Sequence, residues 1–385
     1  MNRQRICVVT GSRAEYGLLY WVLHDLRADP GVELQVIATG MHMAPEYGLT
    51  VREIEADGFT VTRRVEMLLS SDTPGGVAKS VGLGVIGLSD ALSALTPDVV
   101  LLVGDRFEVL AAAQACLIHK IPLAHIAGGD VTEGAFDESI RHAITKMAQI
   151  HFVTNEDAAR RVRQMGEDPA RVHMVGSPGL DHLHRRPLLA RPELEACLGA
   201  PLGAKNLLVT FHPVTLAEHE GLDEFDALLG ALATTQPDTH LWFTRPNADT
   251  SGRAIAARLD AFAAQHPKRA RVYTSLGQPR YLSLMAQVNA VVGNSSSGLY
   301  EAPSLGVATV DVGDRQRGRL AAASVLHCKA EKDAIADALQ RALSLDCSGV
   351  VNPYGDGHSA PRIVSTLRAM PTAVKLVRKP FHSIA

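Results

Sequence analysis

The chain has 385 residues, and at roughly 100–200 residues per domain this length indicates two domains and excludes a lone small module. Hydrophobic residues make up 46% of the chain and charged residues 21%, a globular composition that excludes intrinsic disorder. Lys plus Arg number 38 and Asp plus Glu 41, and this net charge of −3 gives no sequence-wide positive field of the kind nucleic-acid-binding proteins use. We therefore expect no nucleic-acid partner, and a locally built site for any anionic ligand.

The cysteine pattern and the start of the chain predict a reduced, cytoplasmic protein. The 5 cysteines lie far apart and form neither a CxxC pair nor a zinc-finger spacing. The polar residues 1–5 run directly into the apolar segment 6–9, without the pattern of a signal peptide. No apolar run approaches the roughly 18 residues of a membrane span, so we expect no membrane partner.

Short β-branched apolar runs alternate with longer helical patterns along the chain, which predicts an α/β protein with buried parallel strands. In the first half the expected strands are 6–9, 34–38, 99–103, 123–126, 151–153 and 172–175. In the second half they are 207–210, 240–244, 271–273, 290–292 and 308–312.

The strand pattern stops between residues 185 and 201, where three prolines interrupt it. We therefore expect a Rossmann-like domain over 1–185, a second one over 186–365, and a C-terminal helix or tail over 366–385 that crosses back to the first. A single sheet of about eleven strands is the alternative, but it exceeds the size at which cores usually divide. Since doubly wound sheets bind ligands beyond the carboxyl ends of their strands, the residues directly after each strand are the place to look for chemistry.

The first strand ends in TGSRAEYG, a strand-to-helix turn that carries the basic residue Arg13. It resembles a phosphate site but has neither GxGxxG nor P-loop spacing, so ordinary dinucleotide or Walker-type binding loses its main support. The simpler interpretation is that Gly11 makes the turn, Ser12 caps the helix and Arg13 is solvated.

Two later strands of the first half end in carboxylates. The strand 99–103 stops at Gly104-Asp105-Arg106, although Asp105 could instead cap the next helix and pair with a neighbouring Arg. After the strand 123–126, the segment AHIAGGDVTEGAFDES contains four carboxylates, two glycines and a histidine. Carboxylates brought together raise one another's pKa, so one can serve as a base while another stays protonated as an acid. Asp137 could instead cap the helix that follows it.

In the second half, His212 follows the strand 207–210 and is the best single candidate among the 16 histidines. The segment VVGNSSSGLYE indicates a phosphate site, because a strand ends at small polar residues that open a helix. Serines that only cap this helix are the alternative. Glu301 can accept hydrogen bonds from a ribose diol, and GDRQRGR after the strand 308–312 brings guanidinium groups to the same edge.

Taken in order, the motifs TGSRAEYG, GDR, HIAGGDVTEGAFDESIRHAITK, FHP, RPNAD, GNSSSG and GDRQRGR resemble those of hydrolysing UDP-N-acetylglucosamine 2-epimerases. The resemblance spans residues 10 to about 319 and implies a GT-B-like pair of Rossmann-like domains with the nucleotide sugar between them. The implied reaction converts UDP-N-acetylglucosamine and water into N-acetylmannosamine and UDP, by elimination to a glycal and rehydration, for sialic-acid-type sugars. It requires no redox or metal cofactor. The expected partner is a UDP-sugar, and the expected assembly a homodimer or homotetramer.

The same resemblance assigns roles to residues. It makes Asp105, Asp130 and Asp137 the acid/base candidates, and His212 the residue that stabilises the leaving diphosphate or moves a proton. The positions that match substrate or nucleotide contacts are Arg13, His42, Arg106, Asn247, Ser295, Ser296, Glu301 and Arg315.

One departure leaves the sugar open. Many relatives carry Glu at the position of Asp130, and His or Glu at the position of Ala127. The shorter carboxylate can reflect another sugar, such as a UDP-2,4-diacetamido-trideoxyhexose on a legionaminic-type pathway, or a subfamily variant. The pattern also leaves open a non-hydrolysing epimerase, a GT-B glycosyltransferase and a non-enzymatic nucleotide-sugar sensor. The carboxylate cluster argues against the last two.

Overall fold

The computed structural model describes residues 3–69, 71, 73–131, 137–212, 221–245, 252–274, 276–370 and 376–383. The chain divides into two compact units, one with the described residues of 1–131, 137–182 and 354–383, the other with those of 183–353. The predicted boundaries follow residues 185 and 365. Helix α14 (Ser359–Ala369) lies within residues 354–383 and so belongs to the first unit, whereas the prediction places most of this helix in the second domain.

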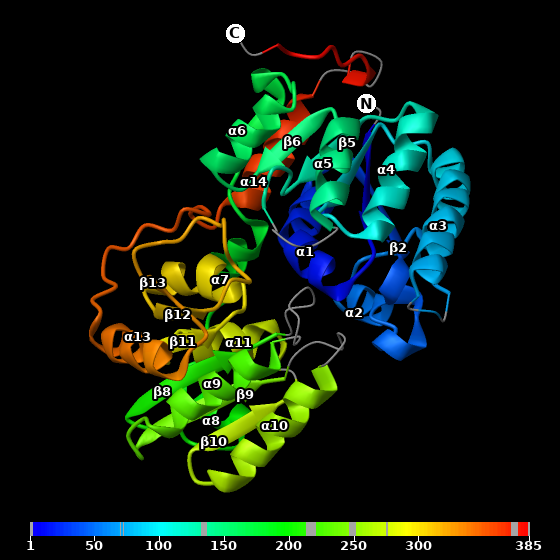
Figure 1. Cartoon of the computed structure of the whole chain (residues 1–385). Helices are drawn as coiled ribbons and strands as arrows, with labels where there is room; N and C mark the ends of the chain where they lie inside the picture. Colours follow the sequence, from blue (N-terminus) through cyan, green and yellow to red (C-terminus); the bar gives the residue numbers. More distant parts are fainter. Residues whose placement is uncertain are drawn as a thin grey trace. The chain divides into compact units, whose positions relative to one another are not determined.

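The first unit contains a seven-stranded parallel sheet in the order β3-β2-β1-β4-β5-β6-β7 (Figure 1). The sheet extends in both directions from β1 and β4, so its topological switch point lies between these two strands. The strands are β1 (Gln4–Thr10), β2 (Val32–Thr39), β3 (Arg63–Val65), β4 (Val99–Val103), β5 (Leu123–Ile126), β6 (Ile150–Val153) and β7 (Val172–Met174). The helices are α1 (Arg13–Ala28), α2 (Val51–Ala56), α3 (Pro74–Leu95), α4 (Phe107–His119), α5 (Asp137–Met147), α6 (Glu156–Gln164) and α14.

The second unit repeats this plan with a six-stranded parallel sheet in the order β10-β9-β8-β11-β12-β13, whose switch point lies between β8 and β11. The strands are β8 (Lys205–Thr210), β9 (Thr239–Thr244), β10 (Ala270–Tyr273), β11 (Ala290–Gly293), β12 (Ala308–Val312) and β13 (Val325–Cys328). The helices are α8 (Arg191–Leu198), α9 (Leu222–Ala233), α10 (Gly252–Gln265), α11 (Gly277–Met285), α12 (Ser297–Tyr300) and α13 (Lys332–Ser344). Helix α7 (Asp181–Arg185) contains the division between the units. The predicted pair of Rossmann-like sheets is confirmed, and the single large sheet is excluded.

Both faces of the first sheet are buried, which explains why its central strands are apolar without alternation. Ile6 and Val8 of β1 lie in one hydrophobic cluster, while Cys7 and Val9 lie in another. All residues of β4 are buried. Crossover helices cover a parallel sheet on both sides, so every side chain of a central strand enters a core.

Two strands that the sequence did not predict, β3 and β13, lie at sheet edges. β3 is Arg-Arg-Val with both arginines exposed, and β13 is Val-Leu-His-Cys with only Val325 fully buried. An edge strand has a neighbour on one side only and tolerates polar residues, so a search for buried apolar runs overlooks it.

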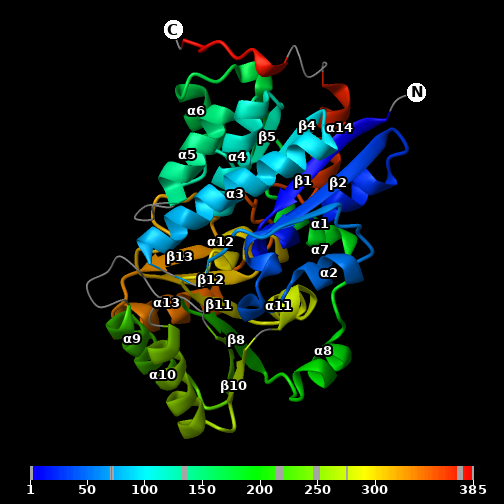
Figure 2. The same ribbon diagram turned by 90° about the vertical axis from the view of Figure 1, so that its right-hand side faces the viewer.

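Helix α3 corrects the expectation that no apolar run is long enough to cross a membrane. Within the part of the chain that the structure describes, this 22-residue helix passes that test by length and composition. It is the crossover between β3 and β4, and Leu88 and Leu92 pack in the core. Figures 1 and 2 show it lying along α4, and 28% of its most apolar stretch is buried in the first unit.

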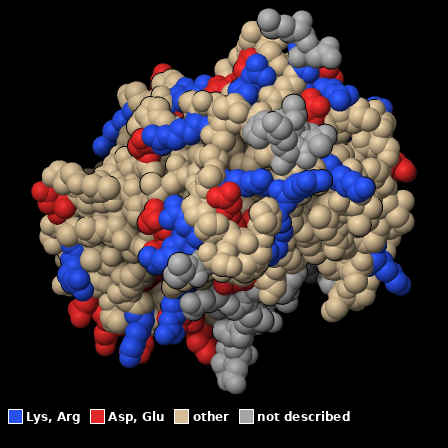
Figure 3. Space-filling view, turned by 90° about the horizontal axis from the view of Figure 1, so that it is seen from above, with Lys and Arg blue, Asp and Glu red and all other residues tan. Residues whose placement is uncertain are grey.

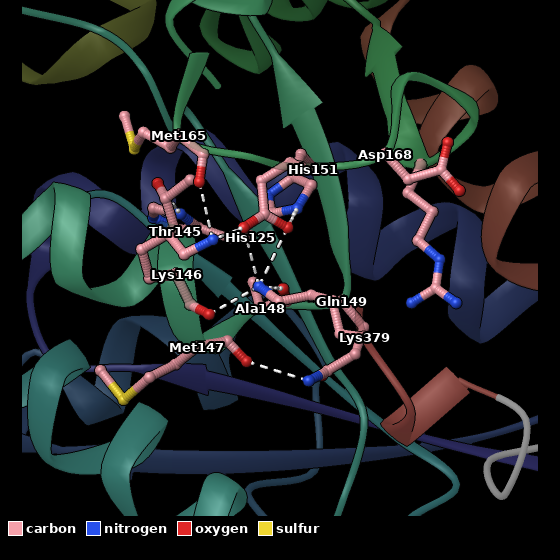
Figure 4. A network of polar contacts seen from close by, with 12 residues as sticks. His125, Thr145, Lys146, Met147, Ala148, Gln149, His151, Met165, Asp168 and Lys379 are labelled. Atoms are coloured by element: carbon pink, nitrogen blue, oxygen red, sulfur yellow. Dashed lines mark hydrogen bonds and ion pairs between the residues drawn. The ribbon is translucent and has the colours of Figure 1, made fainter. Parts of the chain in front are cut away.

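The end of the chain is bound to the first unit. The Lys379 ammonium donates hydrogen bonds to the carbonyls of Lys146 and Ala148, at 2.5 and 2.7 Å, where α5 ends. It also pairs with the buried carboxylate of Glu167 at 2.9 Å. Figure 4 shows this network around the end of α5. The last described residues therefore provide a C-terminal cap for α5.

The surface seen in Figure 3 carries both kinds of charge, with uncharged areas between them. This distribution agrees with the small net charge of the whole chain.

Candidate active site

Asp105 stands at the switch point of the first sheet. Gly104 directly follows β4 with φ of 81°, a conformation that favours glycine, and Asp105 comes next. The Asp105 carboxylate forms an ion pair with the guanidinium of Arg141 from α5, whose side chain is only 6% exposed. Arg141 also donates to the backbone carbonyl of Asp130, at 2.6 Å. Asp105 thus pairs with a buried arginine distant in sequence, and not with its neighbour Arg106.

Asp137 lies near Asp105 and Arg141, whereas Asp130 meets Arg141 through its backbone carbonyl. Asp137 is the first residue of α5. Burial and the nearby charge of Asp105 raise the pKa of Asp137, although Arg106 and Arg141 oppose this effect. The Asp130 carboxylate accepts a hydrogen bond from the hydroxyl of Thr154 at 2.5 Å. The first unit therefore brings together an ion-paired carboxylate and one whose pKa is raised, a difference that acid–base chemistry can use.

Two buried glutamates, Glu15 and Glu108, lie next to Arg106 and were not predicted from the sequence. Arg106 donates two hydrogen bonds of 3.2 Å to Glu108, which is fully buried. Glu15 accepts from the backbone N–H of Gly11 at 2.7 Å, and burial together with Glu108 raises the pKa of Glu15 to about 8. A Cβ at Gly11 would lie 2.9 Å from the Cβ of Glu108, so the turn after β1 requires glycine here. This pair fixes the direction of Arg106.

Arg13 and His42, which the resemblance assigns to substrate contacts, both have partners within the first unit. Ser12 caps α1 as predicted, and Arg13 pairs with Glu53 at 3.1 Å with half of its side chain exposed. His42 is fully buried, and its ring nitrogens lie 3.0 and 2.8 Å from the hydroxyls of Thr10 and Thr50. Burial lowers the pKa of His42 to about 4. These two hydroxyl contacts connect the end of β1 with the residues before α2.

His212 stands at the switch point of the second sheet, where Asn294 holds it. The Asn294 amide accepts from the His212 N–H at 2.7 Å and donates to the His212 carbonyl at 2.9 Å. Burial and the charge of Arg315 lower the pKa of His212 to about 4, so the imidazole is neutral at pH 7. Gly293, the residue before Asn294, has φ of 131°, and a Cβ added to it would lie 1.9 Å from the carbonyl oxygen of Thr210. Glycine is therefore required where β8 and β11 converge.

The serines after β11 form a hydroxyl cluster. The hydroxyl of Ser297 lies 3.0 Å from that of Ser295 and 2.6 Å from that of Tyr281. Ser296 occupies the N-cap position of α12, but its side chain makes no capping hydrogen bond. The helix is only four residues long, so its dipole is smaller than the sequence suggested. A 3₁₀ helix, Ala302–Leu305, follows with a proline in its first turn. Anion binding here must depend on hydroxyl groups and nearby guanidinium groups.

Arg315 and Glu301 flank this cluster. Arg315 donates to the carbonyl of Asn294 at 3.0 Å, and Arg319 lies over the Tyr300 ring, 5.8 Å from its centroid. Arg317 on the same loop is exposed. Glu301 follows α12 directly, and burial raises its pKa to about 8, so at pH 7 the carboxyl group can both donate and accept hydrogen bonds. The second unit thus gathers hydroxyl, guanidinium and carboxyl groups suited to a phosphorylated nucleoside.

Asn247 lies outside the described residues. Among the residues that the structure does describe, no group of three or more His, Cys, Asp and Glu side chains could hold a metal ion.

The sequence profile of the UDP-N-acetylglucosamine 2-epimerase family matches residues 24–368. The chain is 39% identical to the hydrolysing GDP/UDP-N,N′-diacetylbacillosamine 2-epimerase of Campylobacter jejuni over 85% of this chain and 84% of that one. The chain belongs to the UDP-N-acetylglucosamine 2-epimerase family. A second member, the hydrolysing UDP-N,N′-diacetylbacillosamine 2-epimerase of Legionella pneumophila, is 34% identical over 98% of both chains. In fold, the UDP-N-acetylglucosamine 2-epimerase of Rickettsia bellii superposes with a TM-score of 0.78, at 18% identity over 96% of this chain and 97% of that one.

In this member of the family, the structure gathers Asp105, Asp130 and Asp137 in one unit, and His212 with the serines and Arg315 in the other. Sequence reasoning missed the residues that hold them, among which Arg141 and Asn294 are the clearest. The position of Arg141 in its helix could have revealed its role. It lies three residues before Ile144 and four before Thr145, on the same face of α5, and all three side chains are buried. A charged residue on the apolar stripe of a helix predicts a buried ion pair.

Proposed function

We propose that this chain hydrolyses and epimerises a UDP-linked 2-acetamido sugar, with UDP-N,N′-diacetylbacillosamine as its preferred substrate. The choice of sugar is supported by the similarity to two hydrolysing diacetylbacillosamine 2-epimerases, one of which matches over nearly the full length of both chains. The sequence motifs put UDP-N-acetylglucosamine first and a 2,4-diacetamido sugar second, and our proposal reverses that order on the basis of these relatives. With UDP-N-acetylglucosamine, the same chemistry would yield N-acetylmannosamine.

The carboxylate cluster supports a proton-transfer mechanism. Asp105, held as an ion pair by Arg141, removes the proton from C2 while the C1–O bond breaks and its electrons leave with UDP, which gives a glycal. Asp137, whose raised pKa favours the protonated form, delivers a proton to the opposite face of C2. Water adds its hydroxide to C1 and returns its proton to Asp137. The proton held by Asp105 passes to solvent, so the atoms balance.

The second unit supports departure of the diphosphate. His212 is neutral at pH 7 and donates a hydrogen bond, while Arg315 supplies the positive charge that stabilises UDP as it leaves. Glu301, with its raised pKa, binds the ribose diol. None of these steps requires a metal or redox cofactor.

The test is NMR of the products formed in D₂O from UDP-N,N′-diacetylbacillosamine and from UDP-N-acetylglucosamine. We expect a free 2-epimerised sugar with deuterium at C2, and a higher kcat/KM for the diacetamido substrate. A product still linked to UDP, or hydrogen retained at C2, would overturn the hydrolytic elimination. A preference for UDP-N-acetylglucosamine would overturn the sugar alone. A GDP-linked sugar tests the base, because the name of the Campylobacter relative carries both nucleotides.

We also propose that a second copy of the chain covers α3 and α4. Ile86 on α3 is 64% exposed, and Ile118 on α4 is 77% exposed. A hydrogen bond of 2.7 Å joins Ser89 to His119, so both isoleucines lie within one turn of a contact between the helices. Exposed apolar helix faces of this kind mark interfaces, and lysine and aspartate occur only once each in α3.

Sedimentation measurements test this assembly. Ile86→Glu combined with Ile118→Glu should convert a dimer or tetramer into smaller species, because charges would be buried at the interface. Met174→Glu is the matched control, since Met174 is 59% exposed on β7 of the same unit. A wild-type monomer at micromolar concentration, or a double variant that keeps its assembly, would contradict the proposal.

A further inference from the structure

His125 in β5 is buried beside the turn that carries Asp105, and the proposed mechanism does not use it. The side chain is fully buried. Its Nε2 atom lies 2.7 Å from the carbonyl oxygen of Gly104, and its Nδ1 atom lies 3.2 Å from the hydroxyl of Thr145 on α5. Figure 4 shows His125 and Thr145 within the polar network of the first unit. The ring thus connects the end of β4 with the helix that carries Asp137 and Arg141.

The partners of the ring determine its proton positions. A carbonyl oxygen only accepts hydrogen bonds, so Nε2 must carry a hydrogen. Burial lowers the pKa of His125 to about 3, against the opposing effect of the Gly104 bond, so the ring is neutral and Nδ1 has no hydrogen. Both Nδ1 at 3.2 Å and the Arg141 carbonyl at 3.0 Å can only accept, so they share the single hydrogen of the Thr145 hydroxyl.

The charged groups around His125 keep it neutral. Arg141 and His142 from α5 and His151 from β6 all disfavour a positive charge on the ring. The buried carboxylate of Glu167 is occupied by His151 at 2.9 Å, by Lys146 at 2.6 Å and by Lys379 at 2.9 Å. Burial alone would raise the pKa of Glu167, but these bonds outweigh it and lower the pKa to about 2. Its charge is therefore compensated locally and does not promote protonation of His125.

The carbonyl that His125 holds belongs to the turn before Asp105. The Gly104 N–H donates to the carbonyl of Ile126 at 3.1 Å, and the Gly104 carbonyl accepts from His125. Both polar groups of this glycine are therefore bonded to β5. A Cβ at Gly128 would lie 2.8 Å from the Thr145 hydroxyl and 3.0 Å from the His125 Nδ1, so the glycine at 128 leaves room for this contact.

We propose that His125, as the neutral tautomer with hydrogen on Nε2, is a positioning residue that fixes the Asp105 turn relative to α5. It does not touch substrate. It sets the distance between the Asp105 carboxylate and the Asp137 and Arg141 side chains of α5. The expected effect of His125 on turnover rests on the proposed function. The tautomer of His125 does not, because it can be measured in the protein without substrate.

The first test is ¹⁵N NMR of the histidine-labelled full chain, with the His125 signals identified by their loss in His125→Gln. We expect a protonated Nε2 and an unprotonated Nδ1, unchanged between pH 5.5 and 8.5, a window well above the pKa of about 3. His173, half-buried on the edge strand β7, is the internal comparison. A charged ring at neutral pH, or a hydrogen on Nδ1, would overturn the proposal even if no variant folds.

The second test separates the two ring nitrogens by substitution. The amide nitrogen of His125→Gln can occupy the place of Nε2 and reach Gly104, whereas that of His125→Asn occupies the place of Nδ1. We expect His125→Asn to lose about 10- to 100-fold in kcat, the cost of a small misplacement of reacting groups, and His125→Gln to retain most of it. KM and UDP affinity should change little in both.

Equal kcat in the glutamine, asparagine and wild-type proteins would overturn the positioning role. If the tautomer is found but the wild-type chain epimerises no UDP-sugar, the proposed function fails alone. His173→Gln is the matched substitution control and should leave kcat unchanged.

Discussion

Asp137→Asn should lower turnover by about 10²–10⁴-fold, the usual contribution of a general acid or base, because the amide keeps the shape of the side chain but cannot transfer the proton. Wild-type kcat should fall as pH rises through the raised pKa of Asp137, since the acid must be protonated. This descending limb should lie above the usual range of an aspartate and should disappear in the variant. Steady-state rates between pH 4 and 9 measure both effects. The same substitution at Asp105 should give a similar loss.

UDP binding measured by calorimetry should survive both substitutions, because the proposed diphosphate-binding residues belong to the second unit. Glu138→Gln is the matched control, since Glu138 lies next to Asp137 on α5 and pairs with His142 at 3.6 Å. An Asp137→Asn enzyme with near-normal turnover would remove its assignment as acid. Loss of UDP binding in that variant would show that the substitution disturbs more than proton transfer.

Arg315→Ala should weaken UDP binding by about 10- to 150-fold, the equivalent of roughly 1.5–3 kcal/mol for a hydrogen bond to a charged group. Arg315 lies beside the serine cluster and donates to the Asn294 carbonyl. Ser296→Ala should produce a loss in the same range if its hydroxyl binds the diphosphate. Titration calorimetry with UDP measures both affinities.

Arg317→Ala is the control for Arg315, because it removes the same charge from an exposed position of the same loop. Its UDP affinity should stay within about twofold of wild type, since exposed charges contribute little. Unchanged affinity in Arg315→Ala and Ser296→Ala together would exclude this loop as the diphosphate site. A fall in melting temperature for Arg315→Ala would indicate that its bond to Asn294 also stabilises the turn.

The strand ends were predictable because of how parallel sheets are built. Every strand of a doubly wound sheet directs its carboxyl end to the same edge, so Asp105, His212 and Ser296 could be recognised as candidates from their places after apolar runs. The residues that provide the chemistry of such a site lie in short segments directly after the strands. Those segments are also the motifs that revealed the family.

The residues that hold the site were less accessible to sequence reasoning. Arg141 pairs with a carboxylate 36 positions earlier, and Asn294 bonds to a backbone 82 positions earlier. Their partners are brought close only by the order of the strands, which depends on the whole sheet. The partners of His42 could not be inferred from the sequence either: the resemblance assigned this residue to the substrate, and in the structure two threonine hydroxyls contact its ring nitrogens.

The two ends of the chain build the first unit together, and this determines the order in which the protein can be completed. The described residues of 183–353 are contiguous and can fold as a unit while the ribosome makes them. Helix α5, in contrast, is synthesised early, and its contact with Lys379 forms only after that lysine has been made. At ~5–20 residues per second this delay is on the order of 10–50 s. During that time Glu167 lacks one of its two lysines, and α5 lacks its cap. Because Lys379 is synthesised after all the residues of the second unit, the helix that carries Asp137 gains this C-terminal cap only after those residues have been made.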